Sequence, residues 1–237
     1  MGAETSPSAA ASEPAFAQAP VPADHPGVAE LFAVLAYGEI SAFYRLAEDA
    51  KLSPPTLRGR VALASMAAAE MSHFETLHAA LEARGVEIYA AMEPFRRSLD
   101  AYHACTTPPS TWLESLVKAH VGDGIAADFY CEIAGTLAPP EVASVVREVL
   151  AETGHSEFVV HEVRTAVEKS SLEKDRLMLW GRRLLGEAIT QAQYVMAQQE
   201  DLADLVITAT GDLTNIAALF DRMQVEHAKR MAVLGLH

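Results

Sequence analysis

Apolar residues recur at intervals of three and four along most of the chain, whereas runs of alternating apolar and polar residues are scarce. A spacing of three to four residues places side chains on one face of an α-helix, so the pattern predicts an all-α fold. The stripes and the residues that interrupt them predict helices near 26–51, 55–84, 111–137, 140–169, 174–200 and 213–234.

Two pairs of prolines, Pro54-Pro55 and Pro139-Pro140, separate the members of the first two helix pairs. Proline ends one helix and is accepted in the first turn of the next, so each pair predicts a tight turn within a helical hairpin. Residues 85–110 lie between the hairpins and are long enough to carry the chain back along the bundle, partly as a helix. One long crossover between two hairpins predicts a ferritin-like four-helix bundle, with two additional C-terminal helices packed outside it.

The first 25 residues differ from the rest in composition. Residues 1–25 are rich in Ala, Pro and Ser, lack a basic start and contain no continuous apolar run. They predict a disordered tail rather than a signal peptide, and leave residues 26–237 as one helical domain. No segment approaches about 18 uninterrupted apolar residues, so we expect no membrane span and a cytoplasmic protein.

The charge and the cysteines exclude several classes of function. The formal net charge is −14, and the basic pairs along the chain are short and scattered. Such a charge opposes binding to nucleic acid and to anionic membranes. Cys105 and Cys131 form neither a disulfide framework nor a CxxC metal motif.

The pattern Glu-x-x-His occurs three times, at Glu70/His73, Glu75/His78 and Glu152/His155. A single match carries little weight, because a chain with 22 Glu and 9 His residues produces such a match by chance. In a helix, however, residues three apart lie on one face about a turn apart, so both side chains can reach one metal region.

Position separates two of these matches from the third. Glu70 and His73 continue an inward stripe, and Glu152 continues another; the stripes are Gly59, Leu63, Met66, Leu77 and Leu81, and Val142, Val145, Val149, Val159 and Val163. A buried Glu is costly unless it is paired or bound to metal. Glu75 and His78 lie about 140° around the helix from the first pair, so they are expected to be outside the site.

The helix that precedes each pair offers a further carboxylate. Glu39 shares a face with apolar residues in the middle of the first helix; these are Phe32, Leu35, Phe43 and Leu46. The third helix offers two candidates, because Asp128 follows Val117, Val121 and Gly124, whereas Asp123 follows Leu116 and His120. Both stripes could face inward, and Asp128 is favoured.

Together these residues predict a centre for two metal ions. The predicted ligands are Glu39, Glu70, His73, Asp128, Glu152 and His155. Four carboxylates with one imidazole for each ion suit iron or manganese, whereas structural zinc normally takes thiolates or more histidines. The predicted cofactor is two iron ions, with manganese or a mixed pair as alternatives.

The runs Glu70-Met71-Ser72-His73-Phe74-Glu75 and Glu152-Thr153-Gly154-His155 resemble the second and fourth helices of the MiaE-type family. This family consists of non-haem di-iron hydroxylases that act on a modified adenosine in tRNA, and the resemblance covers roughly residues 26–165. It implies a ligand 24 residues before Glu152, which is the position of Asp128, although the family has Glu there. The later helices and the acidic charge are closer to an actinobacterial MiaE-like ferritin-fold group.

The leading hypothesis is an O₂-activating di-iron oxidoreductase of hydroxylase or monooxygenase type. An external electron donor is expected, because the sequence lacks both a Gly-rich dinucleotide motif and a CxxC pair. The charge favours a small-molecule substrate over tRNA. The oligomeric state is left open, with a homodimer as one option. The alternatives are a ferroxidase or iron-handling ferritin-like protein, and a non-enzymatic helical scaffold with a degenerate site.

Overall fold

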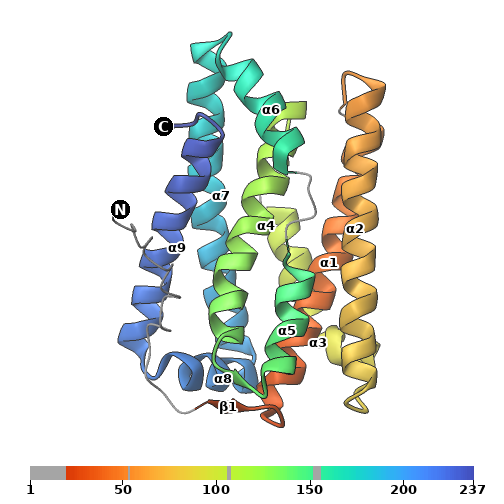
Figure 1. The fold of residues 1–237 in the computed structure, drawn as a ribbon, viewed down its shortest axis with the longest axis vertical. Helices are drawn as coiled ribbons and strands as arrows, with labels where there is room; N and C mark the ends of the chain where they lie inside the picture. The colour runs from red at the N-terminus through yellow and green to blue at the C-terminus, as the bar shows by residue number, and fades with distance from the viewer. Residues whose placement is uncertain (1–19, 53, 106–107, 152–155) are drawn as a thin grey trace, which may run out of the picture.

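The computed structural model describes residues 20–52, 54–105, 108–151 and 156–237. Within these ranges the chain forms helices and two short strands, so the predicted all-α class is confirmed (Figure 1). The elements are β1 (Val21–Pro22), α1 (Pro26–Leu52), α2 (Leu57–Glu82), α3 (Ile88–Cys105), α4 (Trp112–Ala134), β2 (Leu137–Ala138), α5 (Pro140–Val149), α6 (Ser156–Val167), α7 (Ser171–Gln198), α8 (Glu200–Thr210) and α9 (Leu213–Val233).

Helices α1 and α2 form the first hairpin and lie side by side over most of their length (Figure 1). The turn between them includes the predicted proline pair. Thr56 then caps α2, and its hydroxyl accepts a hydrogen bond from the backbone N–H of Gly59 at 3.1 Å. Gly85 follows α2 with φ of 70°, a conformation that favours glycine and turns the chain toward α3.

The second hairpin differs from the prediction in one respect. A single helix was expected over 140–169, but α5 ends at Val149 and α6 begins at Ser156. Leu150 has φ of −93° and ψ of 9°, outside the α-helical range. Helix α4 packs against both α5 and α6, and α5 also packs against α2. Because α4 also contacts α1, these helices form a closed bundle. Helix α3 forms the crossover and packs against α1 and α7.

The C-terminal helices pack against the bundle, as expected. Helix α4 packs against α7 and α9 as well as against α5 and α6, and it lies in the centre of the molecule (Figure 1). Helix α7 buries apolar residues at Trp180, Leu184 and Val195. Residues 201–210, which lie between two of the predicted helices, belong to α8, and α8 packs against α1.

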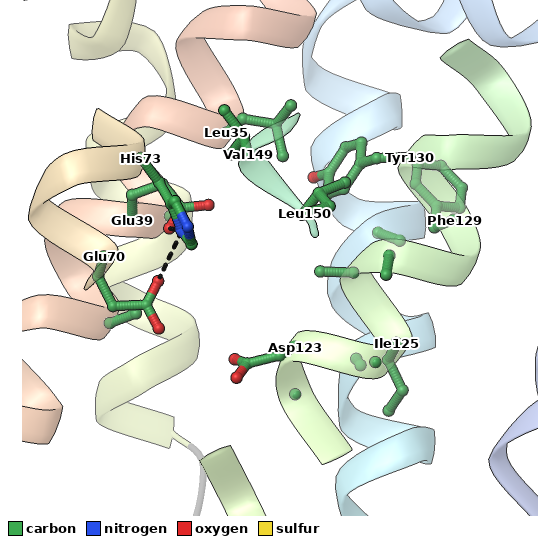
Figure 2. Close-up of a pocket in the computed structure, with 18 of the residues that line it drawn as sticks. Leu35, Glu39, Glu70, His73, Asp123, Ile125, Phe129, Tyr130, Val149 and Leu150 are labelled. Atoms are coloured by element: carbon green, nitrogen blue, oxygen red, sulfur yellow. Dashed lines mark hydrogen bonds and ion pairs between the residues drawn. The ribbon is translucent and has the colours of Figure 1, made fainter. Parts of the chain in front are cut away.

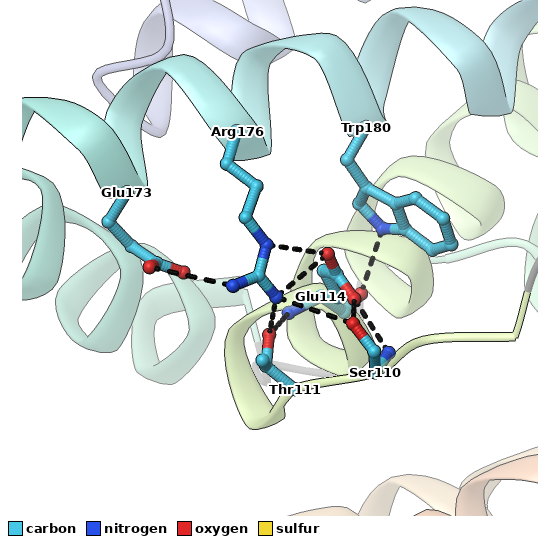
Figure 3. A network of polar contacts seen from close by, with 6 residues as sticks. All are labelled: Ser110, Thr111, Glu114, Glu173, Arg176 and Trp180. Carbon is cyan, nitrogen blue, oxygen red and sulfur yellow. Dashed lines mark hydrogen bonds and ion pairs between the residues drawn. The ribbon is translucent and has the colours of Figure 1, made fainter.

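A polar cluster joins the start of α4 to α7 (Figure 3). Glu114 is buried, and its carboxylate accepts hydrogen bonds from Nε of Arg176 at 2.9 Å and from the backbone N–H of Ser110 at 2.6 Å. Trp180 donates its indole N–H to the carbonyl oxygen of Glu114 at 3.1 Å. Because charged hydrogen bonds are strong when shielded from water, this cluster fixes the position of α7 along α4.

The N-terminal boundary of the fold lies before the predicted one. Val21 is fully buried, and β1 pairs in parallel with β2 in the register Val21 to Leu137. The last residues of the predicted tail therefore belong to the packed domain. Helix α1 is long and apolar enough to cross a membrane, but half of its most apolar window is buried inside the protein, as in a core helix.

Candidate metal centre

Helices α1 and α2 bring together three of the predicted ligands (Figure 2). Nδ1 of His73 lies 3.3 Å from Oε2 of Glu39 and 3.7 Å from Oε2 of Glu70. One donor atom from each residue lies within 4.8 Å of the others. Glu70 and His73 occupy successive turns of α2, and Glu39 meets them from the facing side of α1, as the stripes predicted.

The acids of this cluster are withdrawn from bulk water. Glu39 is 8% exposed and Glu70 is 9% exposed, whereas His73 is half-buried. The apolar neighbours on the same stripe of α2 are also buried; these are Leu63, Met66, Leu77 and Leu81. Two carboxylates held this close in an apolar setting require positive charge or protons between them.

The electrostatics of the three side chains reflect this proximity. Hydrogen bonds with Glu39 and then with Glu70 raise the pKa of His73 to about 10. Burial raises the pKa of Glu39 well above its usual value. Burial also acts to raise the pKa of Glu70, but hydrogen bonds with His73 and Glu39 outweigh it and lower that pKa. The two carboxylates therefore favour a positive charge between them, and two carboxylates with an imidazole suit iron or manganese.

A cavity of about 540 Å³ opens beside the cluster, between the α1–α2 hairpin and helices α4 and α7. Much of its wall is apolar, including Leu35 on α1, Phe129 on α4 and Val149 at the end of α5 (Figure 2). Tyr130 also lines it, and burial followed by the charge of Glu39 raises the pKa of Tyr130 to about 12. A cavity of this size accommodates a small organic molecule next to the cluster.

The two candidate carboxylates of α4 lie in different places. Asp123 lines the cavity, and Figure 2 shows its carboxylate pointing into the space in front of Glu70. The carboxylate of Asp128 instead accepts a hydrogen bond from Nη2 of Arg230 at 2.9 Å, on the side of α4 that faces α9. The preference for Asp128 over Asp123 therefore departs from the observed geometry.

The sequence pattern of α4 does not distinguish these two orientations, for a physical reason. Helix α4 is surrounded by neighbours, so apolar residues are buried on most of its faces, among them Leu116, Val117, Ala119, Val121 and Ile125. An apolar stripe then fails to identify the face that meets α1. Seven residues make almost two full turns, which places Asp123 on the same side as Tyr130. Tyr130 faces the cavity, and this relationship identifies the inward side of α4.

Glu152 and His155 lie outside the described residues. The residues that flank them, Ala151 and Ser156, both line the cavity. The third match is clearly separate from the cluster, because Glu75 is exposed and His78 packs beside the ring of Phe74, with centroids 5.9 Å apart.

Sequence reasoning missed several polar residues of the cavity wall, including three basic side chains that lie near one another. These are Arg45 on α1, His103 on α3 and Lys118 on α4. Lys118 had a visible signal, because it interrupts an otherwise apolar run between Val117 and Ala119. Nothing local in the sequence indicated that Arg45 and His103 would meet it.

Comparison with known proteins supports the ferritin-like fold but assigns no specific activity. A family model described as a ferritin-like domain of actinomycetes matches residues 23–209, which is most of the chain. A comparison with curated proteins gave no match. With the carboxylate and histidine cluster placed between the first two helices of the bundle, the chain belongs to this family of ferritin-like domains.

Proposed function

We propose that this protein is an O₂-activating di-iron oxidoreductase that hydroxylates a small organic molecule. The observation that carries the proposal is the position of the acid and histidine cluster at the wall of a largely apolar cavity. A metal centre that serves only structure has no need of an adjoining cavity. A centre that oxidises a substrate needs both open coordination positions and a shielded space for the substrate.

In this proposal Glu39, Glu70 and His73 would hold the iron, together with Asp123, Glu152 and His155. A bound iron pair supplies the reduction of dioxygen, placing one oxygen atom in a substrate C–H bond and releasing the other as water, with two electrons and two protons from an external donor. The protein contributes the surroundings: Leu35, Phe129 and Val149 line the cavity with apolar surface, which would limit water around a bound substrate.

A ferroxidase remains the second candidate, because the net charge of −14 attracts Fe(II). The apolar cavity favours an organic substrate, since iron as substrate needs a polar path. The native mass in solution separates the two: a 24-subunit assembly supports iron storage, and a monomer or dimer supports the hydroxylase. A MiaE-like action on tRNA remains a narrower form of the proposal, and the charge argues against it.

The test is metal loading combined with oxygen chemistry. Metal-free protein is titrated anaerobically with Fe(II), and bound iron is measured after desalting. We expect close to two ions per chain, and iron-dependent oxygen uptake when an artificial reductant is supplied. Glu70→Ala and His73→Ala should remove the iron while the far-ultraviolet circular dichroism stays unchanged, because apolar packing stabilises the bundle.

Glu75→Ala and His78→Ala are the matched controls, because they alter the same residue types on the same helix away from the cluster. Both variants should keep the full iron content. Full iron content in Glu70→Ala and His73→Ala would remove the centre from these positions. Iron binding without oxygen uptake would favour a scaffold with a degenerate site.

A further inference from the structure

The cavity contains a second group of polar side chains, separate from the acid and histidine cluster. Lys118 lines the cavity from α4 and is only 8% exposed. Arg45 lines it from α1, six residues after Glu39, and His103 lines it from α3. Three helices thus direct basic residues toward one space, although burying a lysine is costly unless its charge is matched.

Neither Lys118 nor Arg45 has a close carboxylate partner among the described residues. Within the described part of the chain, no carboxylate oxygen lies within 4.0 Å of the side-chain nitrogens of Lys118 or Arg45. Asp49 and Glu187 act on Lys118 only at longer range, and Glu187 is held by Arg183 at 2.6 Å. Lys118 is therefore a largely buried residue at the cavity wall, with no ion pair to any described residue.

The effects of charge on nearby pKa values show that Arg45 lies near both the metal cluster and Lys118. The charge of Arg45 contributes to lowering the pKa of Glu70 on one side and of Lys118 on the other. Arg45 therefore lies within range of both groups. Burial, followed by the charge of Arg45, lowers the pKa of Lys118 to about 8, so Lys118 remains largely protonated at neutral pH. Burial and the same two cations lower the pKa of His103 to about 4, which leaves its imidazole neutral.

We propose that Arg45 and Lys118 form a subsite for the carboxylate of the substrate, whose apolar body occupies the rest of the cavity near Glu39, Glu70 and His73. Two cations on different helices can bind one carboxylate together. The planar guanidinium of Arg45 can also donate two parallel N–H···O hydrogen bonds to it. The walls available to the apolar body include Leu99, Leu184 and Val195. The identification of the bound molecule as a substrate rests on the proposed function; the binding itself does not.

Binding is measured on metal-free protein, so that no carboxylate can bind to iron. The probes are octanoate, decanoate and 4-phenylbutyrate, with decan-1-ol as the uncharged counterpart of decanoate, each titrated calorimetrically. We expect saturable binding of at least one carboxylate. Lys118→Met and Arg45→Met should each weaken it at least tenfold while leaving decan-1-ol binding unchanged, since methionine keeps the apolar volume but not the charge.

Lys51→Met is the matched control, because Lys51 is an exposed cation on α1 and its loss changes the net charge equally. It should bind the carboxylates as the unaltered chain does. The inference would be overturned if Lys118→Met and Arg45→Met bound the carboxylates as tightly as the unaltered chain does. It would also be overturned if no probe showed binding that depends on its charge. Iron content is measured in parallel: variants that lose iron but keep carboxylate binding would show that these cations only balance the acid cluster.

The two proposals therefore fail in different ways. If the protein binds no iron but binds carboxylates through Arg45 and Lys118, the anion subsite stands and the proposed hydroxylase function fails. If the protein binds two iron ions but no carboxylate, the metal centre stands and the proposed substrate class fails.

Discussion

Nη2 of Arg230 lies 2.9 Å from Oδ2 of Asp128, and this ion pair joins α9 to α4 across 102 positions of sequence. The guanidinium of Arg230 lies directly against Gly124, where any side chain would collide with it. The acid that the sequence favoured as a metal ligand is thus a partner of the C-terminal helix. The carboxylate of α4 that faces the cavity is Asp123.

Exchange of each acid for its amide distinguishes the two roles. Asp123→Asn should lower bound iron, because it removes a carboxylate from the cavity. Asp128→Asn should keep the iron but reduce the free energy of unfolding by about 1–3 kcal/mol, since it leaves Arg230 half-buried without its charged partner. Iron content and urea unfolding measure the two effects. Iron loss confined to Asp128→Asn would mean that α4 turns its other face to the metals.

The second Glu-x-x-His pair is tested in the same way. Glu152→Ala and His155→Ala should each lower the iron content from two ions toward one, because each removes a ligand expected on the side opposite α2. The flanking residues Ala151 and Ser156 line the cavity, which supports this placement. Unchanged iron in both variants would limit the centre to the cluster of α1 and α2.

Gly27 permits the close approach of α1 and α8. A Cβ atom at Gly27 would lie 2.6 Å from Cβ of Leu205 and closer still to the carbonyl oxygen of Asp201. Gly27→Ala should therefore destabilise the fold by about 1–3 kcal/mol, through overpacking against α8. Gly186→Ala is the control: an added Cβ meets nothing within 4 Å, and alanine should stabilise α7 by about 0.5–1 kcal/mol. Thermal unfolding of both variants gives the comparison, and equal shifts would contradict the packing of α8.

Glu114 predicts a pH dependence of stability. Burial acts to raise its pKa, but hydrogen bonds with Ser110 and Arg176 outweigh burial and lower it below the usual 4.5. A carboxyl whose pKa is lower in the folded chain stabilises the fold above its unfolded pKa, and that stability is lost as the pH falls through the folded value. Glu114→Gln should cost about 1–3 kcal/mol at pH 7. The difference from the unaltered chain should shrink below pH 4.5 in denaturant titrations; a constant difference would exclude an ionised Glu114.

The acidic charge predicts weak binding to tRNA. Each phosphate neutralised by a protein needs a nearby Lys or Arg, and this chain has 18 Lys and Arg against 32 Asp and Glu. We expect no salt-sensitive binding of total tRNA tighter than about 10 μM near physiological ionic strength. A mobility-shift titration measures this. Tight binding that weakens with salt would restore a tRNA hydroxylase as the leading function.

The sequence by itself determined the helical class, the two hairpins and the cluster of Glu39, Glu70 and His73. These depend on local rules: apolar spacing sets the buried face of a helix, prolines set its ends, and residues three apart share one side. The buried residues of α2 form one stripe, and this stripe identified Glu70 as an inward acid. Helix α1 is buried on all sides over residues 31–36, but Glu39 lies beyond that stretch and meets the stripe of α2. The same spacing separated Glu75 and His78 from the cluster.

Only the tertiary structure decided which face of α4 meets the cavity, because α4 packs against several helices and buries apolar residues on most of its faces. It also decided that the stripe of 140–169 is divided between α5 and α6, and that Val21 joins the fold by pairing with Leu137. The meeting of Arg45, His103 and Lys118 at one cavity depends on three helices distant in sequence. Such contacts arise from packing between helices, which the period of a single helix does not specify.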